Sequence, residues 1–179
     1  MDLIYDYLDD IQTDIFSLEI KEIEKKYFKI CKQTANKEIA KKIQQINLDD
    51  YINSLKEKIQ HILLHSDIQD IQAIYFEYDM DNNWEGAFFL CPEYIPLKEE
   101  DDDWASEWTE VIEGPALPEF NEIYSQYDGF EEDSEAGIVI YLIARTILAF
   151  ITSMGSFNTS LPVCIAYHDQ DPIIRIKKD

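Results

Sequence analysis

The first 65 residues carry hydrophobic side chains at the spacing of amphipathic helices. One apolar stripe, with alternating steps of four and three, is formed by Ile4, Leu8, Ile11, Ile15 and Leu18. A second stripe, rotated from the first, is formed by Phe16, Ile20, Ile23, Tyr27 and Ile30. These stripes predict either one long helix with a broad buried face or two helices with a break near Thr13. Two further helices are expected through Ile39–Ile46 and Leu48–Ile62, and Asn47 is suited to cap the second.

Beyond residue 70 the pattern changes to that of strands. Ile71–Tyr78 and Trp84–Cys91 are rich in aromatic and β-branched residues, and the polar residues between them favour a turn, so we expect a β-hairpin. Pro162–His168 and Pro172–Lys177 predict a second hairpin. Within its last strand Arg175 alternates with isoleucines, which predicts that this arginine faces water.

The segments between the two hairpins have helical patterns. Two short patterns are formed by Trp104, Trp108 and Val111, and then by Phe120, Ile123, Tyr124 and Tyr127. Ala136–Met154 is apolar nearly all round, which is typical of a buried helix. The order of helices, hairpin, helices and hairpin predicts an α+β fold. We expect a single domain over 1–179, with a helical part at 1–65 and an α+β part at 66–179. Its antiparallel or mixed sheet would be built from the two hairpins, with the central apolar helix packed on it.

Charge is distributed very unevenly along the chain. The 179 residues carry a formal net charge of −22. Residues 1–65 and 136–179 are nearly neutral, with net charges of −2 and +1, whereas residues 66–135 carry −21 and a single basic side chain, Lys98. Such a protein repels nucleic-acid phosphates and anionic membranes, so neither is an expected partner. A basic protein is the natural electrostatic partner of the acidic middle third.

Several features predict a bacterial, cytoplasmic protein. Cys31, Cys91 and Cys164 are odd in number and set among apolar neighbours, as expected of buried free thiols in a reducing compartment. The acidic N-terminus lacks the basic region of a signal peptide. The longest apolar run, Gly137–Ile151, is shorter than the ~20 residues that span a bilayer, and Arg145 interrupts it. Abundant isoleucine and only two arginines indicate an AT-rich genome.

Candidate metal and catalytic motifs are weak. His61 and His65 have the i, i+4 spacing of a metal pair, but no third ligand is evident, and a polar helix end explains them as well. Asp79–Asn83 begins like a calcium loop, but later ligands are missing and the same residues favour a turn. Serine-hydrolase, P-loop, Rossmann and kinase signatures are absent. We therefore expect no metal, cofactor or catalytic residue, and we interpret Arg145 as half of a structural ion pair.

The acidic run at 99–103 supplies the candidate site. One interpretation is a solvated loop; the other is a recognition patch for a basic surface. Trp104 and Trp108 beside it are either core residues or exposed anchors. The candidate partner-binding residues are Asp101, Asp102, Asp103, Trp104, Glu107, Trp108 and Glu110.

Short motifs in the part of the chain from about Ala73 to the C-terminus suggest a family. They are Ile74–Asp79 followed by a second strand, Glu107–Trp108, Phe120–Glu122, and Gly155–Phe157 after an apolar helix. In this layout the chain resembles a group of small, uncharacterised, acidic bacterial proteins, some of them encoded beside polymorphic toxins. The resemblance implies an α+β fold and an immunity role, and it supplies no catalytic residues. The run at 99–103 and the helical N-terminal part lie outside it.

The sequence thus leads to one main hypothesis and two alternatives. The main hypothesis is an immunity or inhibitor protein whose carboxylates cover the basic cleft of a nuclease-type toxin. The first alternative is a metal-dependent enzyme that uses His61 and His65. The second is a homo-oligomeric scaffold held together by exposed aromatic residues.

Overall fold

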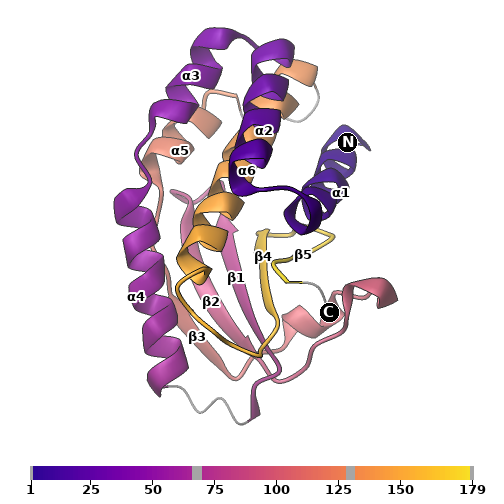
Figure 1. Ribbon diagram of the computed structural model, residues 1–179, viewed down its shortest axis with the longest axis vertical. Coiled ribbons are helices and arrows are strands. Elements are labelled where there is room, and N and C mark those ends of the chain that lie inside the picture. The colour runs from indigo at the N-terminus through magenta and orange to yellow at the C-terminus, as the bar shows by residue number, and fades with distance from the viewer. Residues whose placement is uncertain (1, 66–69, 128–131, 178–179) are drawn as a thin grey trace.

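The computed structural model describes residues 2–65, 70–127 and 132–177 (Figure 1). Its N-terminal part consists of the helices α1 (Asp2–Ser17), α2 (Ile20–Thr34), α3 (Lys37–Gln45) and α4 (Asp49–His65). Of the two predicted alternatives, one long helix or a break near Thr13, neither has the observed position: the break lies at Leu18–Glu19, because Glu19 and Glu22 form a reciprocal capping box that starts a new helix. The Asn47 side chain accepts a hydrogen bond from the amide of Asp49 at the start of α4, as predicted.

Five strands form one mixed sheet in the order β3-β2-β1-β4-β5. The strands are β1 (Ala73–Asp79), β2 (Glu85–Cys91), β3 (Glu110–Glu113), β4 (Val163–Tyr167) and β5 (Ile174–Arg175). The predicted hairpins are the antiparallel pairs β1–β2 and β4–β5, and β1 runs parallel to β4 where the two hairpins meet. The α+β class, the N-terminal helices and the central apolar helix are therefore confirmed.

Strand β3 was not predicted, and it replaces the first short helical pattern. The chain between β2 and β3 forms two 3₁₀ turns, η2 (Leu97–Glu99) and η3 (Asp103–Ser106). The spacing of Trp104, Trp108 and Val111 suggested one α-helix, but Val111 lies opposite Phe89 of β2 in the sheet. Thr109–Ile112 is rich in β-branched residues, which fit a pleated surface better than a helix. The second short pattern is a helix, α5 (Pro118–Tyr124).

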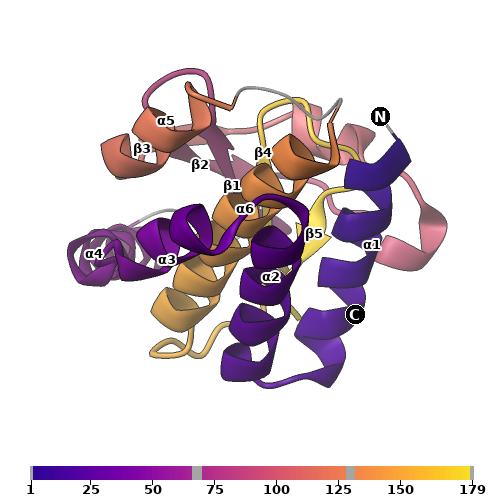
Figure 2. The ribbon, with the colours of Figure 1, turned by 90° about the horizontal axis from the view of Figure 1, so that it is seen from above.

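Helix α6 (Asp133–Met154) is the centre of the fold. The helices α1 to α5 all contact it, and Figure 2 shows α6 between the sheet and the row of α2, α3 and α4. By length and composition α6 could cross a membrane, yet 83% of its most apolar window is buried inside the protein. One hydrophobic cluster extends from Ile4 to Ile174, so the helical part and the α+β part share a core.

The two faces of the sheet are covered differently. Alternate residues of β1, such as Phe76 and Tyr78, pack in the main core with α6. Tyr75 belongs to a smaller cluster on the other face, with Trp104 and Cys164. The chain of η3 covers only part of this second face. The rest of it forms one side of the cleft described below.

Arg175 does not face water, so that prediction is wrong. Its side chain is 2% exposed, because α1 and the chain around η2 and η3 cover the β5 edge of the sheet. The Gln12 side-chain amide donates to the Arg175 carbonyl at 2.9 Å and accepts from the Arg175 amide at 2.7 Å. A side chain of α1 thus takes the place of a neighbouring strand.

Candidate functional site

An acidic cleft lies on the face of the sheet away from α6. It has a volume of about 1210 Å³ and is lined by β1, β2, the η2–η3 chain and the β4–β5 turn. Half of its lining residues are acidic: Glu77, Glu99, Glu100, Asp101, Asp102, Asp103, Asp169 and Asp171. Among the residues that the structure describes, no Lys or Arg lines it. The cleft therefore concentrates negative charge around a concave surface, which focuses the field on a positively charged ligand.

Aromatic rings give the acidic cleft an apolar surface. Tyr75 and Phe89 are register partners on β1 and β2, with ring centroids 5.7 Å apart. Trp108 packs edge-on against Phe89, with centroids 5.1 Å apart, and remains 49% exposed. Trp104 is 3% exposed and packs under the cleft against Tyr75 and Tyr94. The two tryptophans therefore differ: Trp104 is a core residue, and Trp108 is available to a partner.

Asp102 has a structural role as well as a place in the cleft. Its Oδ1 lies 2.6 Å from Nη2 of the buried Arg175, and its Oδ2 accepts a bond from the Ile173 amide at 2.7 Å. The Arg175 guanidinium also donates to the carbonyls of Ile173 and Ile95. Burial alone would lower the pKa of Arg175, but bonding and attraction from Asp102 raise it above its ordinary value. The ion pair ties the η2–η3 chain to β5 and so holds one wall of the cleft.

Three side chains form a hydrogen-bonded row inside the cleft. The Tyr75 hydroxyl donates to Glu77 Oε2 at 2.8 Å, and Glu77 Oε1 lies 3.0 Å from His168 Nδ1. The hydrogen bond to Glu77 and the attraction of the surrounding carboxylates raise the pKa of His168, although burial opposes them. The phenol of Tyr75, buried and beside a carboxylate, also has a raised pKa. These hydrogen bonds hold the three side chains in place along the wall of the acidic cleft.

The other predicted partner-binding residues are only partly brought together. Asp101 and Asp103 line the cleft and are exposed, and Asp101 also accepts a bond from the Asp103 amide at 3.0 Å. Glu107 and Glu110 are exposed but are not among the residues that line the cleft. Glu110 belongs to β3, at the edge of the sheet.

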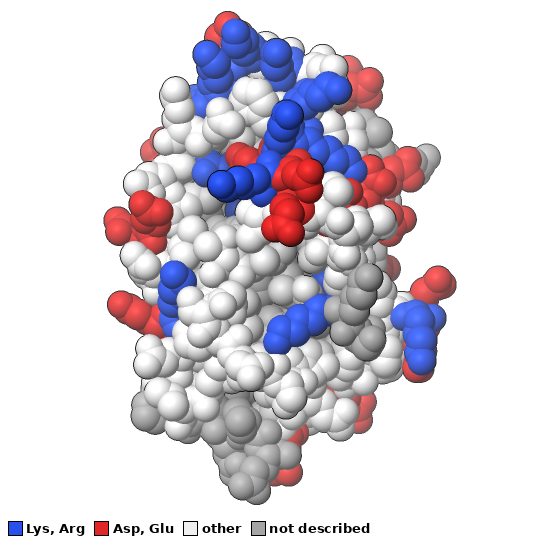
Figure 3. All heavy atoms as spheres, in the orientation of Figure 1, with Lys and Arg blue, Asp and Glu red and all other residues white. Residues whose placement is uncertain are grey.

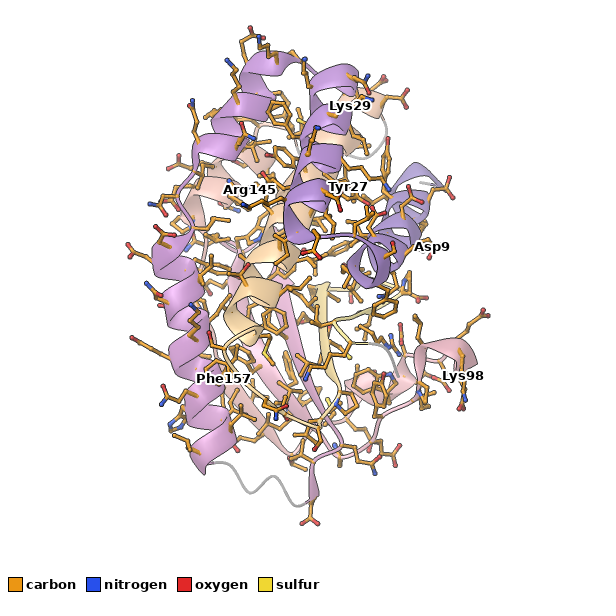
Figure 4. The ribbon with its side chains drawn as sticks, in the orientation of Figure 1. Asp9, Tyr27, Lys29, Lys98, Arg145 and Phe157 are labelled. Atoms are coloured by element: carbon orange, nitrogen blue, oxygen red, sulfur yellow. The ribbon has the colours of Figure 1, made fainter. Side chains whose placement is uncertain are left out.

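Several cleft residues come from parts of the chain that sequence analysis did not connect. Glu77 of β1 and the turn residues His168, Asp169 and Asp171 all line it. A second cleft of about 490 Å³ shares Asp171 and extends the acidic surface to Asp9 on α1, which is labelled in Figure 4. No local motif marks these residues, because Glu77 and His168 meet through the pairing of β1 with β4, and Asp9 is brought in by the contact of α1 with β5.

The residues of the two weak metal motifs lie on helix α4 and in the turn after β1. His61 lies on the exposed side of α4, and the side chain of His65 lies outside the described residues. The Asp79 carboxylate accepts bonds from the amides of Asp81 and Asn82, as in a polar turn. Within the described ranges, no group of three or more His, Cys, Asp or Glu side chains is placed to hold a metal. The three cysteines are buried and form no disulfide among the described residues, as predicted.

The chain matches no protein-family model, no curated protein and no solved structure. The resemblance to proteins encoded beside toxins therefore stays a prediction from short motifs.

Proposed function

We propose that this protein is a cytoplasmic immunity or inhibitor protein that neutralises a basic, nuclease-type toxin. The observation that supports this proposal is the acidic cleft, where eight acidic residues and the half-exposed ring of Trp108 line one concave surface. The proposed partner presents a basic, convex segment that enters the cleft. No catalytic step is part of the proposal.

Charge complementarity and the burial of Trp108 would drive the binding. A nuclease binds phosphates with lysine and arginine, and the carboxylates of the acidic cleft offer the same cations an alternative set of oxygens. The field of the cleft would steer the partner during diffusion and raise the association rate by about 10- to 1000-fold. An exposed tryptophan surrounded by polar groups matches the residues that dominate binding energy in interfaces. Trp108 would therefore supply affinity, and the carboxylates would supply speed and selectivity.

Capture of the partner tests the proposal. The tagged protein is expressed in its own host, partners are bound at low salt, and bound proteins are eluted with a salt gradient. We expect a basic protein that elutes as salt rises, because screening weakens exposed charge pairs. Expressed alone, that protein should stop growth, and co-expression with this chain should restore growth. Capture of no partner, or of one whose retention is insensitive to salt, would contradict the proposal.

A further inference from the structure

A separate groove lies among the helices, away from both clefts of the acidic surface. One wall is α2, the other is the α3–α4 connection with the start of α4, and the bottom is α6. Its volume is about 1010 Å³. We call it the basic groove, because its charged lining residues are Lys21, Lys25, Lys29, Lys32 and Arg145 against Glu24 and Asp49. Figure 3 shows Lys and Arg gathered over α2 and α3 on this face. Because the whole chain has a net charge of −22, this local excess of positive charge distinguishes the basic groove from the acidic cleft.

The lysines follow one wall of the basic groove at intervals of about one helical turn. Lys21, Lys25, Lys29 and Lys32 lie on the same side of α2, since residues three and four apart share a helix face. At ~1.5 Å per residue, the row is about 16 Å long. The positive charge is therefore distributed along the groove and is not concentrated at one end.

Apolar residues from all three sides line the inside of the groove. They are Phe28 on α2, Leu48 and Ile52 on the opposite wall, and Leu148 and Ala149 on α6. Ile20, at one end, is 40% exposed. An apolar strip beside a row of cations matches an occupant with one apolar face and one acidic face.

Arg145 makes the groove rigid and does not itself offer a free charge. Its guanidinium donates to the carbonyls of Ile43 and Ile46, and Nε lies 3.6 Å from a carboxylate oxygen of Glu24, which confirms the predicted ion pair. In Figure 4 it reaches from α6 toward the chain between α3 and α4. These bonds fix the two walls relative to α6, so the groove is formed before anything binds.

We propose that the basic groove binds an acidic amphipathic helix of a partner protein. A groove between two helices accepts a third helix, whose apolar residues at i, i+3, i+4 and i+7 would contact the apolar lining residues. Acidic residues on the flank of that helix would meet the lysine row. A fatty acid carries a single charge at one end, which leaves most of the row unpaired. Nucleic acid would not use the apolar lining of the groove and is repelled by the rest of the chain. The protein's own acidic cleft is concave and cannot enter a concave groove.

The test uses a defined probe and matched variants. The probe is a fluorescein-labelled, four-turn peptide of alanine, leucine and glutamate, with leucines at i, i+3, i+4 and i+7 and glutamates beside them. The control peptide has lysine in place of each glutamate. Anisotropy measures binding to the full chain, to the double variant Lys25→Glu with Lys29→Glu, and to the control variant Lys56→Glu with Lys58→Glu. The control pair lies on α4 outside the groove and changes the net charge equally.

We expect the glutamate peptide to bind in the micromolar range and the lysine peptide not to bind. Lys25→Glu with Lys29→Glu should weaken binding about tenfold or more, since two attractive rim charges become repulsive. The control variant should bind like the parent chain. The proposal is overturned if the glutamate peptide fails to bind at millimolar concentration, or if both variants weaken it equally. It is also overturned if phosphatidylglycerol vesicles or a DNA oligonucleotide bind this groove in place of the peptide.

Discussion

Replacing Asp102 with asparagine separates the structural role of this residue from its place in the acidic cleft. The substitution keeps an oxygen that can accept the Ile173 amide and removes the charge that faces Arg175. Arg175 is 2% exposed, so its guanidinium would remain buried without its anionic partner. Breaking a buried ion pair from one side costs about 3–5 kcal/mol.

The lower end of that range applies here. The Asp102 side chain is 19% exposed, and Arg175 also donates to two carbonyls, so part of its hydrogen bonding survives. We expect a loss of about 3 kcal/mol in the free energy of unfolding. For a chain of this size the melting temperature would fall by about 6–12 °C. Asp102→Ala should cost ~1 kcal/mol more, because the Ile173 amide also loses its acceptor.

Urea denaturation at neutral pH measures the effect. Asp103→Asn is the matched control: it removes the same charge from an exposed neighbour and should change stability by less than about 0.5 kcal/mol. Arg175→Met combined with Asp102→Asn should cost less than the sum of the two single changes, since neither charge is then left alone. A cost below about 1 kcal/mol for Asp102→Asn would refute the reasoning.

Three further outcomes are expected. Trp108→Ala should change stability by less than about 1 kcal/mol but weaken binding of the captured partner by ~2 kcal/mol or more, as calorimetry would show. Glu77→Gln should lower the pKa of His168 in an NMR titration; because that pKa is raised in the folded protein, the contact stabilises the fold fully below about pH 6.5 and loses this contribution as pH rises through the folded-state pKa. Gly137→Ala places a methyl group in steric overlap with Thr34 Oγ1 and 2.9 Å from its Cβ; urea titration should show a loss of about 1–3 kcal/mol, part of which Thr34→Ala recovers.

Much of the fold could be predicted from the sequence, because those elements depend on local patterns. The apolar stripes of α2 to α4, the hairpin signal around Asp79 and the uniform hydrophobicity of α6 each act within a few turns of chain. Strand β3 (Glu110–Glu113) was not predicted because Val111 has helical spacing from Trp104 and Trp108. These four residues form a strand only because they pair with β2. The prediction that Arg175 faces water was wrong because alternating residue types show only that the two faces of a strand differ. Whether the second face is covered depends on α1 and on the chain near Ile95, distant in sequence.

The candidate site was predictable only in part. The run at 99–103 indicated the acidic wall, but the pattern did not show that Asp102 would pair with Arg175 or that Trp104 would be buried. Glu77 and His168 joined the cleft through the parallel pairing of β1 with β4. That pairing joins segments about 90 residues apart, and no local spacing encodes it.

The association rate of the captured partner tests the central claim most directly. Glu99→Lys combined with Asp103→Lys reverses two exposed charges of the acidic cleft and leaves Asp102 intact, while Glu57→Lys with Glu122→Lys makes the same change in net charge elsewhere on the surface. Stopped-flow measurement at low salt should show that the cleft variant associates about tenfold or more slowly. The control variant should associate at nearly the parent rate, and added salt should reduce the difference. Equal rates for the two variants would contradict the account, because the cleft would then have no part in binding.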